Sequence, residues 1–381
     1  EENFFKVDFV DNLKLRASWG QLGNQEIDDY LFYDTYSFGY DYSFGNTLFS
    51  GISINDVMAN SAITWEKTDQ IDVGIDADFW GGKLSFTGDF FLKNTHAILL
   101  KLPMPDLIGV DAPMQNAGKV RNTGFELALT HRNQLNLFKY SASFNFSYVK
   151  NEITDLNGGD IPGRSVGDPV DNIYGYVCEG IFRTQEEIDN SCSQIWGAVP
   201  GDLKYADINN DNVVDQSDRI SLGSTFPKIN FGLRLNCEYR NFDLTMLMQG
   251  AGMVKGVTAG EISQAFMNGG KVTEEWLDRW TPNNINASYP RLTLSSSSRN
   301  YMTSSFWVQN ASYLKMRNLQ IGYTIPKHLL TNWGISNLRL YCSIDNLFTI
   351  SNFKGLDPEM VTSSTLYPLT RNYSFGVNLS F

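Results

Sequence analysis

The sequence predicts an all-β protein: a transmembrane antiparallel β-barrel with long extracellular loops. Three observations predict it. Apolar and polar residues alternate along many segments, as expected of strands with one face on lipid and the other on water. The connections between these segments are alternately short and long. The final segment, residues 371–381, keeps the alternation and ends on Phe381, an aromatic residue that suits a membrane interface.

The final segment shows the pattern most clearly. Its two faces separate completely, because successive side chains of a strand point to opposite sides. One face is aromatic or aliphatic at every position, and the other carries only small or polar residues. The first face holds Tyr373, Phe375, Val377, Leu379 and Phe381, and the second holds Ser374, Gly376, Asn378 and Ser380.

Earlier segments repeat this alternation. We therefore predict about ten strands, each near the roughly 9–11 residues that a tilted strand needs to cross a bilayer. In chain order, the earlier apolar faces lie within residues 13–19, 71–79, 84–92, 125–129, 140–148, 231–239, 242–248, 319–323 and 338–344.

The connections fall into two classes. Short turns are expected at 80–82, 133–137, 240–241 and 326–337, and long loops near 23–64, 95–120, 150–228, 252–310 and 350–370. Outer-membrane barrels sort their connections in this way, with short periplasmic turns and long external loops. A soluble β-sandwich would give the alternation, but not strands of this length with sorted loops and an aromatic terminus.

Composition narrows the class of protein further. The chain has 381 residues, of which 42% are hydrophobic and 13% aromatic, yet no stretch is apolar enough for a membrane helix. The net charge of -12 argues against a nucleic-acid partner, which would need basic stripes. Ten strands could close as a small barrel. The large loops, and a start at Glu1 without Met or signal peptide, instead predict a fragment or mature product carrying the later strands of a larger barrel.

Six segments, taken together, resemble a known family. They are Leu13–Asn24, Ile63–Gln70, Gly175–Phe182, Pro200–Asp211, Ser312–Pro326 and Gly355–Glu359. They run from near one end of the chain to the other and occur in the family's order. On these segments, the sequence is similar to the C-terminal half of SusC/RagA-type TonB-dependent transporters of Bacteroidetes outer membranes.

The resemblance implies the architecture and the activity of the whole protein. It implies a 22-stranded barrel filled by a plug domain, with residues 1–381 supplying the C-terminal portion and the plug and earlier strands lying outside them. It also implies energy from a TonB complex acting through that plug, and a SusD-like surface lipoprotein as a lid. The expected function is import of an oligosaccharide or oligopeptide across the outer membrane, without catalysis.

Two other classes of barrel stay open at this point. One is an outer-membrane hydrolase, either a protease or a lipid-modifying enzyme, complete in about ten strands. The other is a structural or adhesive barrel. No nucleophile–base spacing favours the hydrolase, and His96, His131 and His328 are isolated in the sequence.

Within the long loop at 150–228, residues 207–218 have the spacing of an EF-hand-like calcium loop. Oxygen donors recur at the positions that such a loop uses, and a backbone carbonyl serves at the seventh. Asn212 replaces the usual glycine and Asp218 the usual glutamate, which lowers the expected affinity. The alternative is a surface turn that binds no metal. The predicted Ca²⁺ ligands are Asp207, Asn209, Asp211, Val213, Asp215 and Asp218.

Three other groups of residues have both a functional and a structural interpretation. The aromatic residues between Tyr30 and Phe49 could stack on sugars or contact a lid, but their spacing near two favours an extension of the barrel wall whose rings pack together. Charges on the inner face could contact cargo or pair across strands. They are Asp72, Asp76, Asp78, Asp89, Glu126, Arg234, Glu238, Arg339 and Asp345. Cys178 and Cys192 share one external loop and could form a disulfide, whereas Cys237 and Cys342 lie on lipid-facing positions.

Overall fold

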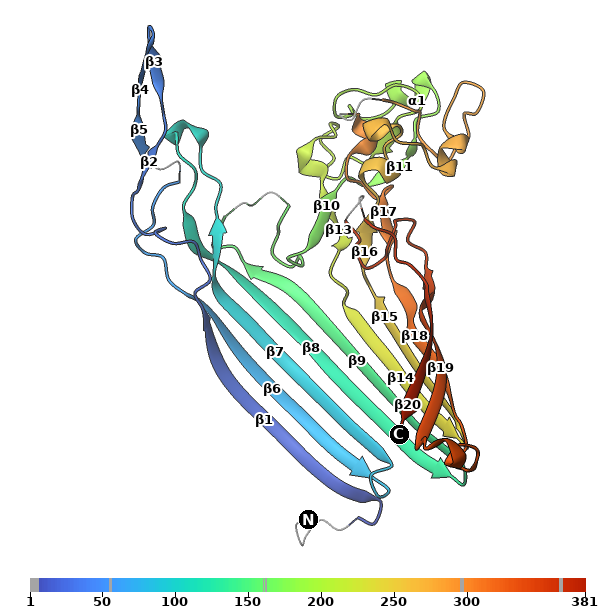
Figure 1. Ribbon diagram of the computed structural model, residues 1–381. Coiled ribbons are helices and arrows are strands. Elements are labelled where there is room, and N and C mark those ends of the chain that lie inside the picture. The colour runs from blue at the N-terminus through green and yellow to red at the C-terminus, as the bar shows by residue number, and fades with distance from the viewer. Residues whose placement is uncertain (1–6, 55–56, 160, 162, 295–297, 363–365) are drawn as a thin grey trace.

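Ten long strands form one antiparallel sheet in the part of the chain that the structure, a computed structural model, describes. That part comprises residues 7–54, 57–159, 161, 163–294, 298–362 and 366–381. The sheet is open and curved (Figure 1). Its strands, in spatial order, are β1 (Val10–Asn24), β6 (Glu66–Phe79), β7 (Leu84–Lys101), β8 (Met114–Leu135), β9 (Phe138–Asp155), β14 (Ile229–Tyr239), β15 (Phe242–Gly252), β18 (Tyr313–Thr324), β19 (Asn337–Ser351) and β20 (Asn372–Ser380).

Short elements occupy the long loops and one of the short turns. The two-stranded ribbons are β2 (Tyr36–Phe38) with β5 (Ile52–Ile54), β3 (Tyr42–Phe44) with β4 (Thr47–Phe49), β10 (Asn172–Gly175) with β13 (Ile220–Ser224), β11 (Cys178–Ile181) with β12 (Leu203–Tyr205), and β16 (Lys255–Val257) with β17 (Val308–Asn310). The helices are α1 (Gln185–Asp189) and the 3-10 turns η1 (Asp106–Ile108), η2 (Gln216–Asp218), η3 (Gly260–Ile262), η4 (Met267–Gly269), η5 (Glu274–Asp278), η6 (Arg299–Tyr301), η7 (Lys327–Leu329) and η8 (Thr331–Trp333).

The pairing register confirms the predicted alternation. Leu15 lies opposite Ile75 and Ile75 opposite Gly88, so apolar positions follow one another across β1, β6 and β7 on a single face. Near the short turns this face carries paired aromatic rings. Phe9 stacks on Phe79 at 6.3 Å between centroids, and Phe242 contacts Tyr323 at 4.7 Å. Rings at this level are typical of the interfacial girdle of a membrane barrel.

The short turns end their strands as expected. The turn between β6 and β7 contains Gly81 and Gly82, both with positive φ, and the turn between β8 and β9 places Asn136 in the same left-handed region. Such turns suit the twist of a hairpin. No helix among the described residues is long and apolar enough to cross a membrane.

The strands are longer in the first half of the sheet than the alternation predicts. From β1 to β9 they have 14 to 22 residues. From β14 to β20 they have 9 to 15. The loop expected near 95–120 is therefore shorter than predicted, because β7 continues to Lys101 and β8 starts at Met114. Above the lipid both faces of a strand meet water. The backbone hydrogen bonds between strands therefore continue there, although apolar and polar residues no longer alternate.

Candidate functional site

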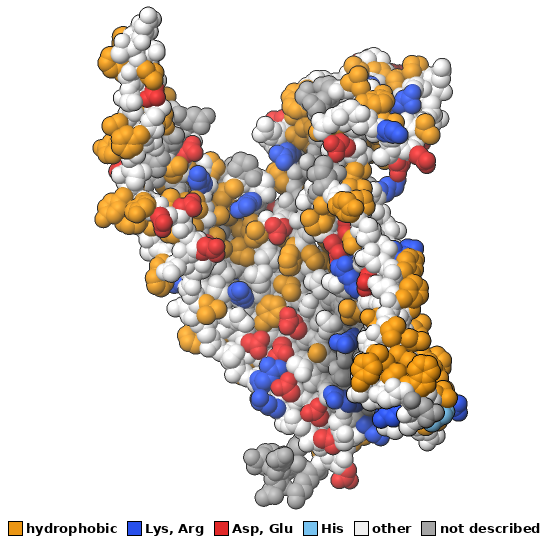
Figure 2. All heavy atoms as spheres, in the orientation of Figure 1, with side chains coloured by type: hydrophobic (Ala, Val, Ile, Leu, Met, Phe, Trp, Pro, Cys, Tyr) orange, Lys and Arg blue, Asp and Glu red, His pale blue; other side chains and the backbone are white. Residues whose placement is uncertain are grey.

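The inner face of the sheet carries charges that pair across neighbouring strands. Arg16 on β1 reaches Asp76 on β6 through Nε at 2.8 Å and Asp89 on β7 through Nη2 at 2.7 Å. Gly74 lies between Arg16 and Asp89 in the register, and a Cβ there would collide with both side chains. The absence of a side chain thus lets an ion pair cross the intervening strand. Figure 2 shows acidic and basic side chains gathered over the lower part of the sheet.

A second pair repeats the arrangement at the other side of the sheet. Arg339 on β19 binds Asp243 on β15 through Nε at 2.9 Å, across Gly322 of β18. Asp78 accepts a hydrogen bond from Ser85, and Asp345 accepts one from Asn318. The structural interpretation of these inner charges, pairing across strands, is therefore confirmed for Asp76, Asp89 and Arg339. Arg16 was not expected to take part.

At the end of the sheet that carries the long loops, three loop segments pack into one body, here called the loop cap. These segments, called the first, second and third excursions, are the described residues of 156–228, 253–312 and 352–362. One apolar core joins Tyr176, Leu203, Tyr205 and Val214, and a second joins Ala265, Trp276 and Trp307. Tyr176 N–H donates to Thr303 O at 3.0 Å, linking the first excursion to the second. The cap stands over one side of the sheet in Figure 1.

A buried polar network holds the first two excursions together. Asp202 accepts from Arg291 Nε at 2.6 Å, from Asn300 Nδ2 at 2.9 Å and from the Val199 backbone at 3.1 Å. Arg299 donates to Gly197 O and to Gln194 Oε1, both at 2.6 Å. Burial lowers the pKa of Arg299 from its ordinary value, since desolvation disfavours the charged form. This network fixes the cap's geometry.

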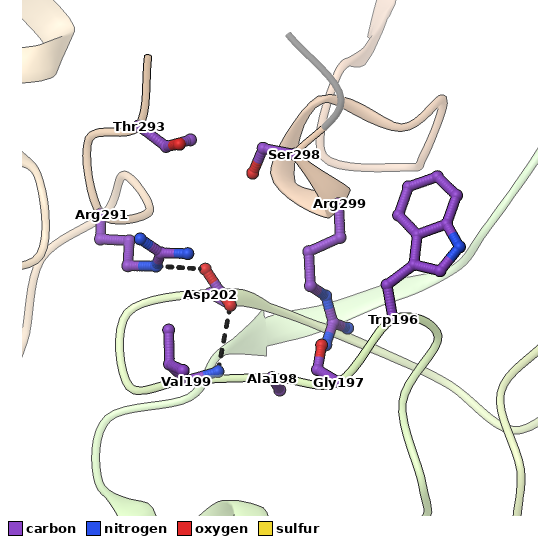
Figure 3. A pocket seen from close by; sticks show the side chains of 9 residues that line it. All are labelled: Trp196, Gly197, Ala198, Val199, Asp202, Arg291, Thr293, Ser298 and Arg299. Atoms are coloured by element: carbon purple, nitrogen blue, oxygen red, sulfur yellow. Dashed lines mark hydrogen bonds and ion pairs between the residues drawn. The ribbon is translucent and has the colours of Figure 1, made fainter. Parts of the chain in front are cut away.

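Asp202, Arg291 and Arg299 of this network also line a shallow pocket of about 400 Å³ on the cap (Figure 3). Arg291 and Asp202 lie on one side of it, and Arg299 and the indole of Trp196 on the other. Because the Asp202 carboxylate and both terminal nitrogens of Arg299 already form hydrogen bonds within the network, these charged groups of the pocket are structural. We assign no cargo role to it.

The third excursion is held to the sheet by a buried cluster of charges. Lys315 on β18 binds Asp357 Oδ1 at 2.6 Å and Glu359 Oε2 at 2.8 Å. Arg317 also pairs with Glu359, and Tyr313 donates its hydroxyl to the same carboxylate at 2.8 Å. Two of the six family-like segments, 312–326 and 355–359, therefore contact each other. In the sequence, these residues were marked only by the resemblance of their two segments, in their order, to the family.

The predicted calcium loop is stabilised by its own backbone. Asp207 accepts the N–H groups of Asn210 at 2.7 Å and Asn212 at 2.8 Å, and Asn212 adopts φ 66°. Asp218, fully buried, accepts from Ile208 at 2.7 Å and from Asp215 at 2.8 Å.

The remaining predicted ligands lie in the same loop. Asn209 accepts from the Asp211 backbone at 2.9 Å, and Asp211 accepts from the Val213 backbone at 2.8 Å. Asp215 caps η2 by accepting from Ser217 at 2.7 Å. No group of three or more His, Cys, Asp or Glu side chains is placed to hold a metal ion in the described ranges. The calcium site stays a prediction.

The cysteines of the first excursion are both free thiols. Cys178 contacts Gly180 O at 3.4 Å, and Gln194 Nε2 contacts Cys192 Sγ at the same distance. Burial raises the pKa of the Cys178 thiol to about 11, so it is protonated at neutral pH.

The aromatic residues of the first long loop form a projecting arm. This aromatic arm, residues 30–54, consists of the ribbons β2–β5 and β3–β4, which are not hydrogen-bonded to the ten-stranded sheet. It is therefore no extension of the wall, although some rings do pack together: Phe44 contacts Tyr42 at 5.0 Å and Phe49 at 6.1 Å. Phe38 is 76% exposed. The arm rises at the opposite side of the sheet from the loop cap (Figures 1 and 2).

Comparison with known proteins identifies the family. A family model described as TonB dependent receptor-like, beta-barrel, matches residues 4–347. The chain belongs to this family. TonB-dependent receptor P3 of Formosa agariphila is 28% identical over 414 residues, covering all of this chain and 40% of the relative. TonB-dependent receptor SusC of Bacteroides thetaiotaomicron is 28% identical over 405 residues, covering all of this chain and 39% of SusC.

Solved structures agree with this assignment. The RagAB peptide transporter superposes with a TM-score of 0.80 at 24% identity, over all of this chain and 42% of that one. The RagAB peptide importer in its open-open state gives 0.79 at 25% identity, over 99% and 41%. This chain of a TonB-dependent receptor is thus an outer-membrane β-barrel segment that spans about two fifths of its relatives, at 40% of receptor P3. The comparisons give the rival barrel hydrolase no support.

Proposed function

We propose that this chain forms part of the wall and the extracellular cap of a barrel that imports an oligosaccharide or an oligopeptide. The observation that carries the proposal is the polar inner face. Its ion pairs, such as Arg16 with Asp76 and Asp89, keep the wall hydrated and rigid, while the loop cap stands over one side of the sheet. The protein acts by binding and conducting, not by catalysis.

A growth and uptake experiment tests this role. Deleting the gene should abolish uptake of one labelled class of oligomer in the native host, and dissipating the proton gradient that powers TonB should have the same effect. Uptake of a small sugar or amino acid that crosses general porins serves as the control. Unchanged uptake of both oligosaccharides and oligopeptides in the deletion strain would refute import.

The proposed partners are a SusD-like lipoprotein and the TonB complex. The aromatic arm supports the first, since exposed rings such as Phe38 make large, rigid contacts at protein interfaces. TonB would act through a plug domain that these residues do not supply.

Co-purification from native membranes tests the lipoprotein. Replacing Phe38, Tyr42 and Phe44 by serine should release it, because these rings are exposed in the arm. Serine replacement of Leu135 and Leu137, exposed at the opposite end of the sheet, is the matched control and should leave the complex intact. Equal recovery of the lipoprotein with both variants would exclude the arm as its contact.

We also propose that the loop 207–218 takes up Ca²⁺. Supporting this, Asp207 Oδ2 and Asp211 Oδ1 each accept one backbone N–H and keep a further lone pair for a hard cation. Asp207 and Asp211 would be ligands, and binding would stiffen the first excursion. Calorimetry should detect one Ca²⁺ per chain, lost on Asp207→Asn with Asp211→Asn and kept on Asp189→Asn, an exposed carboxylate of α1. If adding Ca²⁺ to the unaltered protein gives no heat of binding, the loop is a surface turn that binds no metal.

A further inference from the structure

The outer face of the long strands has a polar region directly above the apolar band. Along β1, β6 and β7 the apolar positions end at Trp19, Ile71 and Leu92, which lie side by side in the register. The next outward positions are Gln21, Asp69 and Asn94. Since β7 continues to Lys101, the sheet rises well beyond the level at which its lipid-facing side chains stop.

Basic side chains dominate this region, here called the outer basic patch. It spans β6 to β9. Lys119 binds Asp155 at 2.8 Å, and His96 binds Asp69 at 2.8 Å. Arg121 lies 4.0 Å from Glu152, which Lys150 also contacts. The patch comprises Lys67, His96, Lys119, Arg121 and Lys150, with Asp69, Glu152 and Asp155 as its carboxylates.

The cations of the patch project further than the carboxylates. The side chains of Arg121 and Lys150 are 47% and 54% exposed, whereas Glu152 between them is 20% exposed. Two cations share this one carboxylate, so positive charge is left over at the surface. That local excess contrasts with the net charge of -12 for the whole chain.

The second half of the sheet has no counterpart of this patch among its described residues. There β14, β18 and β20 begin with the outward apolar residues Ile229, Leu314 and Tyr373 at or next to their first positions. The polar extension is thus confined to one sector of the wall. A barrel that needed only to span the membrane would not require it.

We propose that the outer basic patch binds the phosphate groups of glycolipid headgroups in the outer leaflet. The patch continues the lipid-facing surface upward, to the level where headgroups replace acyl chains. Arg and Lys side chains bind phosphate oxygens strongly, and juxtamembrane basic clusters hold anionic lipids. Arg121, Lys150 and Lys119 would grip the phosphates, and Asn94 and Gln21 would hydrogen-bond to headgroup sugars. Lipid binding at the patch requires only the outer-membrane location. It does not depend on which cargo the barrel imports.

Lipid retention by the protein purified from its native outer membrane tests the proposal. The variant Lys119→Gln, Arg121→Gln, Lys150→Gln should retain at least about tenfold less lipopolysaccharide, counted per barrel by native mass spectrometry. The control Lys93→Gln, Lys139→Gln, Arg234→Gln removes the same charge from the inner face and should retain the wild-type amount. Both must migrate as folded barrels on gels.

Two outcomes would overturn the proposal. One is equal retention by the two variants. The other is a change in oligomeric state of the outer variant with unchanged lipid, which would make the patch a protein interface. A competition arm identifies the chemistry: lipopolysaccharide stripped of its phosphates should displace bound lipid at least about tenfold less well than the intact form. Equal displacement would refute phosphate recognition.

Discussion

The loop cap and the aromatic arm are both extracellular and both rich in aromatic residues, yet they pack in opposite ways. In the cap, Trp276 and Trp307 are nearly inaccessible, and Trp307 contacts Phe306 at 4.7 Å and Tyr289 at 6.1 Å. In the arm, Phe38 and Phe44 are largely exposed. Aromatic content alone therefore does not distinguish a folded core from an exposed surface.

The two regions differ in whether their side chains have a second layer of structure to pack against. An isolated two-stranded ribbon has no layer to bury its side chains against, and the arm consists of two such ribbons. The cap draws its layers from excursions far apart in the chain, as the bond from Tyr176 to Thr303 shows. The cap should behave as one cooperative unit, and the arm as an independent element of low stability.

The largest expected effect is on the core of the cap. Trp276→Ala removes a fully buried indole that touches Tyr289 at 5.4 Å and Tyr301 at 6.3 Å, so it should cost the cap about 3–5 kcal/mol. Hydrogen exchange of the folded protein in detergent checks this result. Amides throughout 253–312 should lose protection together, while those of the arm stay unchanged. Loss confined to η5 would show that the cap is not cooperative.

The second expected effect concerns the attachment of the third excursion. Lys315→Met leaves Asp357 and Glu359 without their shared cation, and breaking a fully buried ion pair costs about 3–5 kcal/mol. Here about 2–3 kcal/mol is expected, because Arg317 still neutralises Glu359. Amide exchange at 353–362 should rise by about tenfold or more. Lys354→Met, whose partner Glu275 lies at a longer 3.5 Å, is the control and should change little.

The sequence predicted the elements that depend on neighbours along the chain. Alternation placed the strand containing Leu13 to Trp19, and the glycines at 81 and 82 marked a hairpin turn. The sequence pattern could not predict contacts between segments that lie far apart in the chain. Nothing local shows that Lys315 meets Asp357, or that Arg16 reaches Asp89 over Gly74. The arm was misassigned to the wall for the same reason, since period-two spacing gives a strand but not the sheet to which it belongs.

The third prediction concerns acid and a single loop of the cap. Hydrogen bonds from the Ser288 hydroxyl and the Asn284 amide hold the pKa of Asp278 below its usual value near 3.8. The stability that the Asp278 carboxylate contributes to the folded loop is fully present above the usual value, and it is lost as the pH falls through the lower folded-state pKa.

Pepsin cleavage between 278 and 288 checks this acid dependence, with cleavage in the arm as an internal reference. From pH 5 to pH 2 the ratio of cap to arm cleavage should rise in the wild type. It should rise less in Asp278→Asn, which has no charge to lose. An identical rise in both proteins would assign the acid sensitivity to other groups.

The smallest expected effect is in the arm, where Phe38→Ala should change stability by less than about 0.5 kcal/mol. The ring of Phe38 is 76% exposed, so folding removes little of its surface from water. Phe44→Ala is the informative comparison, because its contacts with Tyr42 and Phe49 should add about 0.5–1.5 kcal/mol. Amide exchange in β3 and β4 measures both. If Phe38→Ala instead unprotects the arm as Trp276→Ala unprotects the cap, the arm has a buried core of its own, and the contrast between the two regions fails.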